Sequence, residues 1–406
     1  MSHQLMLPEA QIVSLVKPLM VSEFDTDPIE QFAALSWSII CEPGDGFAGK
    51  LIDTFGSARA LSLELLKTPA SEYVGLFADA GSDWLEMQEF GKFESILADS
   101  RQRWGSRMNS SNVLGAIQKV SKLGGWFVSP LNQLWPSNLD DLERHKPRGL
   151  WGFGNSRSLE TESIAFVGSR ITSAYGEMVT SELAGSAVAS GFSVVSGGAY
   201  GIDSMAHRVA LAMQGTTLAI MAGGIDRLYP SGNAQLFEQI RQVGCVISEM
   251  PPGAEPTKWR FLQRNRLIAA LGSATIVVEA GERSGAASTA NRAHSLGRPV
   301  GAVPGPITSP GSQGCHKLIQ DSVAQLVTSG DDVLELVGIS RGSQANNAIG
   351  LGALEVRVFD AIGFASMTSA EISHSAGLTA SEIKIALTSL QLLGMIQGDS
   401  RGWRRV

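Results

Sequence analysis

The sequence has few residues of the kinds that mark a secreted, metal-binding or membrane-spanning protein. Its three cysteines, Cys41, Cys245 and Cys315, lie far apart and form no CxxC pair. This spacing argues against a disulfide framework or a thiolate zinc site, and it favours buried free thiols. The N-terminus lacks a basic segment followed by a long apolar run, and no apolar stretch approaches the ~20 residues that cross a bilayer. We therefore expect a cytoplasmic protein without membrane association, metal or cofactor.

The chain also lacks an excess of positive charge. It has 32 Lys and Arg against 39 Asp and Glu over 406 residues, a formal net charge of −7. This balance argues against nucleic-acid binding through bulk positive charge. The distribution is uneven, however: residues 1–159 carry 14 basic and 19 acidic side chains, residues 160–330 carry 12 of each, and residues 331–406 carry 6 and 8. The middle of the chain is therefore neutral between acidic flanks.

Length and hydrophobic pattern predict a folded protein of two or three domains. The first, residues 1–110, is helical: Phe32, Leu35, Ile39 and Ile40 fall on one helix face. The turn at 42–46 contains Pro and Gly, and a second helix follows it. Two short helices around such a turn resemble a helix-hairpin-helix or SAM-like module, although an ordinary helical packing domain fits the pattern equally well.

Short β-rich runs and helices alternate from residue 163 to about residue 338. Strands at 164–167, 192–195, 217–221, 245–248, 275–278 and 299–303 are separated by helical stretches, several of which end at glycine. This alternation predicts βαβ units and a parallel sheet. We expect an α/β, Rossmann-like, doubly wound domain over residues 111–338, with its core at 160–338 and a short irregular or β element at 124–152.

The C-terminal part predicts a linker and a small module. Residues 339–350 are polar and read as the linker. In residues 351–406, Thr368 and Glu371 have the spacing of a capping box, a second helix follows Thr379, and Gly-containing segments near the end suit a hairpin. Helices followed by a hairpin are typical of a winged helix. Such a module can bind duplex DNA, but its acidic balance favours contact with protein.

Small residues follow the predicted strands, where parallel sheets bind ligands. Gly168, Ser169 and Arg170 end one strand, and Ser196, Gly197 and Gly198 end another. Small residues let an anion approach backbone N–H groups, and an arginine suits phosphate. The dinucleotide GxGxxG fingerprint is incomplete at both places and no Walker motif is present, which argues against a nicotinamide dehydrogenase or a P-loop ATPase.

Asp203 and His207 lie four residues apart and could suggest a Ser-His-Asp triad with Ser196. The favoured interpretation is structural, with Asp203 as a helix N-cap and His207 hydrogen-bonded inside the domain. No other spacing indicates paired catalytic carboxylates.

A basic cluster lies within residues 258–298. This window has seven cations and two acids, a local charge of +5. Aromatic residues alternate with the cations in Lys258-Trp259-Arg260-Phe261, and Arg264-Asn265-Arg266 follows. Aromatic stacking combined with phosphate neutralisation suits a single strand bound with little sequence preference. We expect one or two of the arginines to pair with carboxylates inside the domain. The seven cations are Lys258, Arg260, Arg264, Arg266, Arg283, Arg292 and Arg298.

Together these segments resemble the DNA-processing protein A (DprA/Smf) family. The matching pieces run in the family's order over roughly 165 residues: 167–170, 195–203 with 206–207, 229–230 with 233, 248–253, 261–268, 278–280, 284–285 with 289–290, and 302–305. Three places differ from the family pattern, at Leu262, Ala270 and residues 286–288, and the last leaves local loop contacts open. Taken with the basic cluster, the resemblance implies a DNA-binding site at Gly168, Ser169, Arg170, Ser196, Gly197, Gly198, Lys258, Arg260, Phe261, Arg264, Asn265, Arg266, Ser284 and Gly285.

The resemblance implies a DNA-binding protein without a catalytic step. Family members bind single-stranded DNA, dimerise, and help to load RecA recombinase on DNA taken up during natural transformation. The alternative is a nucleotide-binding or nucleotide-cleaving enzyme similar to the phosphoribohydrolases, which share the Rossmann-like architecture. Their Pro-Gly-Gly-x-Gly-Thr-x-x-Glu signature is absent, and the nearest run, residues 279–285, does not match it.

Overall fold

The computed structural model describes Leu5 and residues 7–21, 27–82, 90–339, 351–363, 365–399 and 401–405. The chain divides into two compact units, Met1–Ser340 and Arg341–Val406. Except for residue 339, the predicted linker at 339–350 lies outside the described residues. The predicted boundary near residue 110 falls inside the first unit and stays a prediction.

The first unit is built around a nine-stranded sheet, in the order β1-β2-β6-β5-β4-β3-β7-β8-β9. Neighbours from β6 to β9 are parallel, whereas β1 and β2 run antiparallel and extend the β6 edge. The mainly parallel, Rossmann-like sheet is thereby confirmed. The strands are β1 (Trp126–Val128), β2 (Leu150–Gly154), β3 (Ser163–Val167), β4 (Ser193–Ser196), β5 (Thr217–Met221), β6 (Cys245–Ser248), β7 (Gly272–Val277), β8 (Val300–Ala302) and β9 (Gln325–Leu326).

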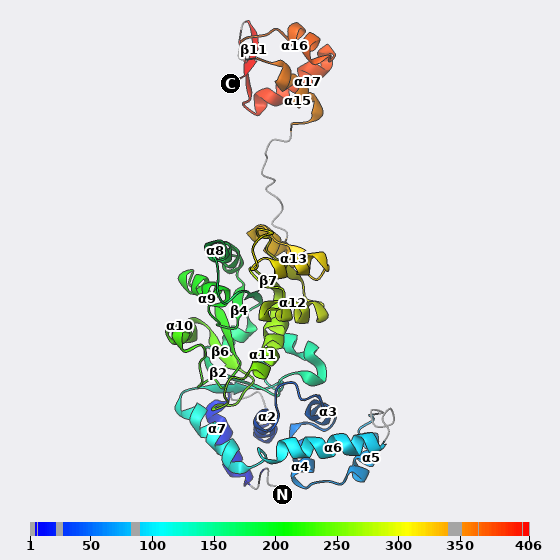
Figure 1. Cartoon of the computed structure of the whole chain (residues 1–406), viewed down its shortest axis with the longest axis vertical. Coiled ribbons are helices and arrows are strands. Elements are labelled where there is room, and N and C mark those ends of the chain that lie inside the picture. Colours follow the sequence, from blue (N-terminus) through cyan, green and yellow to red (C-terminus); the bar gives the residue numbers. More distant parts are fainter. Residues whose placement is uncertain are drawn as a thin grey trace. The chain divides into compact units, whose positions relative to one another are not determined.

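Helices cover both faces of the sheet (Figure 1). Alternate residues of β3 divide between the two cores, because successive side chains of a strand point to opposite faces. Ile164 and Phe166 pack with α8, α9 and α14, whereas Ala165 and Val167 pack with α11, α12 and α13. The helices are α8 (Ala174–Ala189), α9 (Ile202–Ala212), α10 (Ala234–Val243), α11 (Lys258–Leu271), α12 (Gly285–Ser295), α13 (Gln313–Gln320) and α14 (Gly330–Leu336), with short 3-10 turns at η2 (Ser137–His145), η3 (Ser156–Glu160) and η4 (Ser231–Asn233).

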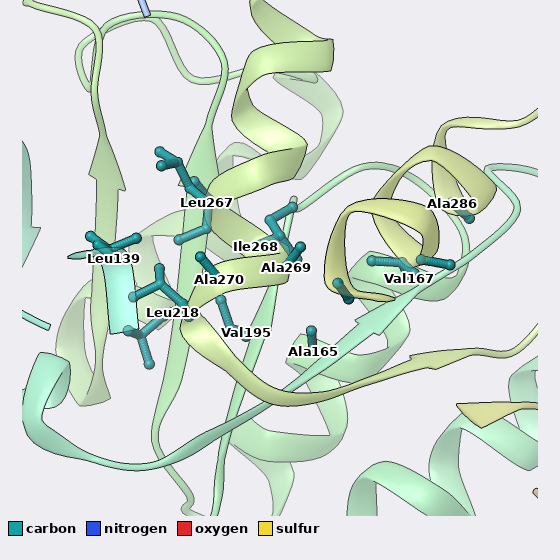
Figure 2. Close-up of a cluster of buried hydrophobic side chains, with 14 of the residues drawn as sticks. Leu139, Ala165, Val167, Val195, Leu218, Leu267, Ile268, Ala269, Ala270 and Ala286 are labelled. Atoms are coloured by element: carbon teal, nitrogen blue, oxygen red, sulfur yellow. The ribbon is translucent and has the colours of Figure 1, made fainter. Parts of the chain in front are cut away.

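Helix α11 lies directly on the central strands (Figure 2). Its residues Leu267–Leu271 are buried against Ala165 of β3, Val195 of β4 and Leu218 of β5, and the small side chains at 269 and 270 allow close packing. The sequence pattern predicts this helix around Phe261–Leu271, and it starts about one turn earlier, at Lys258. The Thr257 hydroxyl accepts a hydrogen bond from the Arg260 N–H at 3.3 Å and caps it there.

The N-terminal helices pack against the antiparallel edge of the sheet. Helices α1, α2 and α7 share a hydrophobic cluster with Phe127 of β1 and with Trp151 and Phe153 of β2. The predicted helix pair around the Pro43–Gly46 turn is present as α2 and α3, and its resemblance to a SAM-like module stays a prediction. The elements are α1 (Glu9–Val16), η1 (Lys17–Leu19), α2 (Pro28–Ile40), α3 (Gly46–Phe55), α4 (Ser57–Leu65), α5 (Ala70–Asp79), α6 (Phe90–Gly105) and α7 (Ser110–Lys122).

The second unit has the elements that the sequence predicts. Capping boxes occur at Thr368 with Glu371 and at Thr379 with Glu382, and a hairpin follows the helices. A winged helix has this order of elements, and the assignment stays a prediction. The elements are α15 (Ala353–Ala361), α16 (Ser369–Ala376), α17 (Ala380–Leu392), β10 (Ile396–Asp399) and β11 (Gly402–Arg405).

The three cysteines are buried and free, as expected. In the part of the chain that the structure describes, no helix is long and apolar enough to cross a bilayer.

Candidate nucleic-acid interface

The carboxyl ends of the central strands meet at one edge of the sheet. Strand β3 lies between β4 and β7, and the chain leaves β3 in one direction through β4, β5 and β6 and in the other through β7, β8 and β9. The order of strands therefore reverses beside β3, which is where open α/β sheets form a crevice for ligands.

A cavity of about 870 Å³ occupies this edge. Its walls are the loop after β3, the starts of α9 and α12, one side of α11 from Lys258 to Ile268, and the loops around Tyr229 and Pro256. Nine of the predicted site residues therefore meet here, from three distant parts of the sequence. They are Gly168, Ser169, Arg170, Lys258, Phe261, Arg264, Asn265, Ser284 and Gly285.

An aromatic ring with a cation on it lies at the mouth of the cavity. The Arg170 guanidinium lies 5.6 Å from the centroid of the Phe261 ring, and the Tyr229 ring meets Phe261 edge to face at 5.6 Å. Arg170, Lys258 and Tyr229 are exposed. Within the described residues, neither Arg170 nor Lys258 has an ion pair. Two cations without an ion pair, beside the exposed Tyr229 ring and the half-buried Phe261 ring, can contact phosphates and bases together.

Hydrogen bonds to Glu279 hold the loop that carries Arg170. This buried carboxylate accepts hydrogen bonds from the Ser173 hydroxyl at 2.5 Å, the Ser173 N–H at 3.0 Å and the Thr172 hydroxyl at 3.2 Å. Glu279 follows β7 and the loop follows β3, so the bonds tie the two sides of the switch point together. Glu279 thereby has a positioning role.

Arg264 lines the same cavity but is buried. One terminal nitrogen donates to the carbonyl oxygens of Gly197 at 2.7 Å and Ile220 at 2.6 Å, at the ends of β4 and β5. Burial lowers the pKa of Arg264 to about 10, against the opposing attraction of Asp203. Burial raises the pKa of Asp203, and the Arg264 charge lowers it. The Arg264 Nε–H donates to the Asn265 side-chain oxygen at 3.3 Å, so Arg264 braces two strand ends and also contacts the neighbouring Asn265.

Ser196, Gly197 and Gly198 lie beneath the cavity and are buried. The Ser196 hydroxyl donates to the Phe166 carbonyl at 2.6 Å, and the Asn233 amide donates to the Gly198 carbonyl at 2.9 Å. A Cβ atom at position 197 would lie 2.1 Å from the Arg264 guanidinium. A side chain at position 197 would collide with Arg264, which explains the glycine at this position. None of the three lines the main cavity, although Gly197 lines a small adjoining pocket with Arg170 and Tyr200.

Helix α12 begins at the opposite wall. Ser284 caps it by accepting from the Ala287 N–H at 3.2 Å, and the Asn265 amide donates to the Gly285 carbonyl at 3.3 Å. Its first backbone N–H groups lie at the cavity, where the positive end of a helix dipole favours an anion. Asn265 thus holds α11 and α12 together.

Two predicted site arginines point away from the cavity. Arg266 is buried and pairs with Glu249 at 2.5 Å, and Arg260 donates to Glu42 at 2.8 and 3.2 Å. Arg298 of the same basic cluster pairs with Asp141 at 2.6 Å. Three arginines are therefore paired, one more than the sequence led us to expect.

The triad interpretation is not supported. His207 is buried and its Nδ1 lies 2.7 Å from the Thr217 hydroxyl, whereas Ser196 donates to Phe166. His207 is thus held inside the domain as expected, and burial lowers its pKa to about 3. The N-cap of α9 is Gly201, so the expectation that Asp203 is the N-cap was wrong; its carboxylate accepts from the Ala199 N–H at 3.4 Å. In the described ranges, no group of three or more His, Cys, Asp or Glu could hold a metal.

Sequence reasoning missed several cavity residues. Tyr229 and Leu262 are about half exposed, and Ile171 is almost fully exposed, at 91%. Tyr229 is joined to Pro230 by a cis peptide. Hydrophobic residues near the Gly-Ser-Arg segment and the basic cluster could have indicated these positions. The sequence does not show, however, that their side chains are exposed.

Comparisons with known proteins agree with this architecture. Residues 126–338 match the family model of DNA recombination-mediator protein A. The chain is 36% identical over 373 residues to the "Putative DNA processing protein DprA" of Mycobacterium tuberculosis strain H37Rv, covering 87% of this chain and 95% of that protein. It is 42% identical over 210 residues to the "DNA processing protein DprA" of Streptococcus pneumoniae strain R6, covering 51% of this chain and 72% of that protein. The X-ray structure of DNA processing protein A from Streptococcus pneumoniae superposes with a TM-score of 0.58 at 30% identity, covering 76% of this chain and 97% of that one.

Proposed function

The chain belongs to the DNA recombination-mediator protein A family, and from that premise we propose that it binds single-stranded DNA in the cavity beside β3. The supporting observation is the Arg170–Phe261 contact at 5.6 Å, beside the exposed Lys258, at the mouth of the cavity. Cations next to a stacking surface bind backbone and bases without reading sequence. The cavity edge also carries the start of α12, a further attraction for phosphate.

The proposal includes no chemical step. Asp203 in the cavity wall and Glu279 behind the loop are both engaged within the protein: Glu279 accepts three hydrogen bonds from residues 172 and 173, and the Arg264 charge attracts the buried Asp203. The protein binds and protects DNA taken up in natural transformation, acts as a homodimer, and loads RecA recombinase on the strand. Release of a free base from nucleotides by the purified protein would instead support the phosphoribohydrolase-like alternative.

The test is fluorescence anisotropy with labelled oligo-dT at several salt concentrations. We expect Lys258→Ala to weaken binding and to lower the salt slope by about 0.7, the value for one lost contact on a single strand. Phe261→Ala removes a stacking partner, which is worth about 1–3 kcal/mol per base.

The matched control is Arg208→Ala. Arg208 is exposed on α9, outside the cavity lining. It has no ion pair within the described residues. Equal affinities and slopes for the Lys258, Phe261 and Arg208 variants would place the DNA elsewhere.

A further inference from the structure

The first turn of α11 sends three consecutive side chains into different surroundings. Lys258 lines the main cavity, Trp259 lines a second cavity of about 430 Å³, and Arg260 pairs with Glu42. We call the second cavity the Trp259 pocket. Since consecutive Cα atoms are about 3.8 Å apart, it begins next to the proposed DNA site.

The walls of the Trp259 pocket come from the N-terminal helices and from η2. They include the Pro43–Gly46 turn, Phe47 at the start of α3, Arg103 of α6, and Arg144 and His145 of η2. All belong to the same compact unit as α11. A cavity with two aromatic rings, two arginines and a histidine has the composition of a surface that binds single strands.

Close packing builds this pocket. His145 Nδ1 lies 2.9 Å from the Gly44 carbonyl oxygen, and a Cβ atom at position 46 would lie 2.5 Å from the His145 ring. A Cβ atom at position 49 would lie 1.9 Å from the Arg144 carbonyl oxygen. Glu143, just before these residues, has a φ of 51°, which a non-glycine residue rarely adopts. Backbone strain of this kind clusters at functional sites.

The acids of the pocket have hydrogen-bond or ion-pair partners inside the protein, whereas its two arginines have no carboxylate partner among the described residues. Asp45 accepts from the Phe47 and Ala48 N–H groups at 3.1 Å and from the Trp104 indole at 2.9 Å. Glu42 pairs with Arg107 and Arg260. Arg103 and Arg144 are exposed and, among the described residues, neither has a carboxylate partner.

We propose that the Trp259 pocket is a second contact site for the same single strand, in which Trp259 stacks on a base and Arg103 and Arg144 neutralise phosphates. This inference rests on the proposed function, because the strand is expected to arrive from the main cavity past Lys258. Trp259 is 56% exposed, so its ring is available for stacking. A strand that follows this course contacts the N-terminal helices as well as the Rossmann-like core.

The experiment compares a short and a long oligo-dT, of about 6 and about 25 nucleotides, which bracket the site sizes of single-strand binding folds. We expect Trp259→Ala to weaken binding of the long probe by about fivefold or more and to leave the short probe unchanged. Trp259→Phe, which keeps an aromatic ring, should restore most of that loss. Arg144→Ala should lower the salt slope for the long probe by about 0.7.

The controls separate the inference from the function on which it rests. Arg208→Ala should bind both probes like the wild type, and urea unfolding should show that every variant is folded. If Lys258→Ala weakens both probes while Trp259→Ala and Arg144→Ala bind the long one normally, the second site is wrong and the proposed function stands. If the wild type binds neither probe, both fall.

Discussion

The sequence predicts Arg170 and Arg264 as members of one DNA-binding site, yet their surroundings in the structure differ. Arg170 is exposed and contacts only the Phe261 ring among the interactions described, whereas Arg264 is buried and donates to two carbonyl oxygens. We predict that Arg170→Ala damages DNA binding with little effect on folding, and that Arg264→Ala damages folding first.

The magnitudes follow from these contacts. Loss of Arg170 removes a cation–π contact worth about 0.5–1 kcal/mol at an exposed site. Loss of Arg264 leaves two carbonyl oxygens without their donor and removes the cation that the buried Asp203 faces. Each buried hydrogen-bond acceptor left without its donor costs about 1–3 kcal/mol. Since domains are stable by about 5–15 kcal/mol, Arg264→Ala approaches the limit of folding.

Urea unfolding gives the two stabilities, and anisotropy with oligo-dT gives the two affinities. Arg170→Ala should unfold within about 1 kcal/mol of the wild type, with a salt slope lower by about 0.7. Arg264→Lys keeps the charge but loses the guanidinium geometry, so its stability should lie between those of Arg264→Ala and the wild type. Wild-type stability of Arg264→Ala would refute the bracing role, and an unchanged slope for Arg170→Ala would refute its phosphate contact.

Two further predictions concern the framework of the site. Burial lowers the pKa of His207 to about 3, so this group stabilises the fold above its unfolded pKa of about 6.5 and loses that contribution as pH falls towards 3. Between pH 7.5 and pH 5.5, the free energy of unfolding measured with urea should fall by about 1.4 kcal/mol more for the wild type than for His207→Gln. Equal decreases in the two proteins would contradict this. Gly197→Ala should cost about 1–3 kcal/mol because its Cβ atom meets Arg264, whereas Gly281→Ala, with open space, should cost less than about 0.5 in the same assay.

The sheet could be predicted from the sequence because its signals are local. Each of its parallel strands except the short edge strand β9 is a short apolar run, and glycines such as Gly191 and Gly244 follow the helices between them. The start of α11 was placed one turn late, because one capping hydroxyl on Thr257 decides it. The antiparallel strands β1 and β2 were read as a short lead-in element. The pairing of β2 with β6 depends on contacts about a hundred residues apart, which no local pattern encodes.

The site could be predicted only in part, because composition does not show where a charge points. Nine residues of the predicted site reach the main cavity, since strand ends and helix starts converge at a switch point. Arg260, Arg266 and Arg298 point elsewhere because Glu42, Glu249 and Asp141 pair with them. Two of those acids are more than 150 residues away from their partners, so the local pattern predicts some pairing but does not identify which arginines pair.

These ion pairs also explain how an acidic chain can offer a cationic surface. The cluster at 258–298 has a local charge of +5 by sequence, but three of its arginines are paired and Arg264 is buried. Lys258, Arg283 and Arg292 remain exposed, and Arg170 joins Lys258 at the cavity. Glu42 of the N-terminal region thus holds Arg260 in the first turn of α11, while Lys258 and Trp259 stay exposed. What decides binding is therefore which cations lack an internal partner, and the net charge of −7 does not measure that.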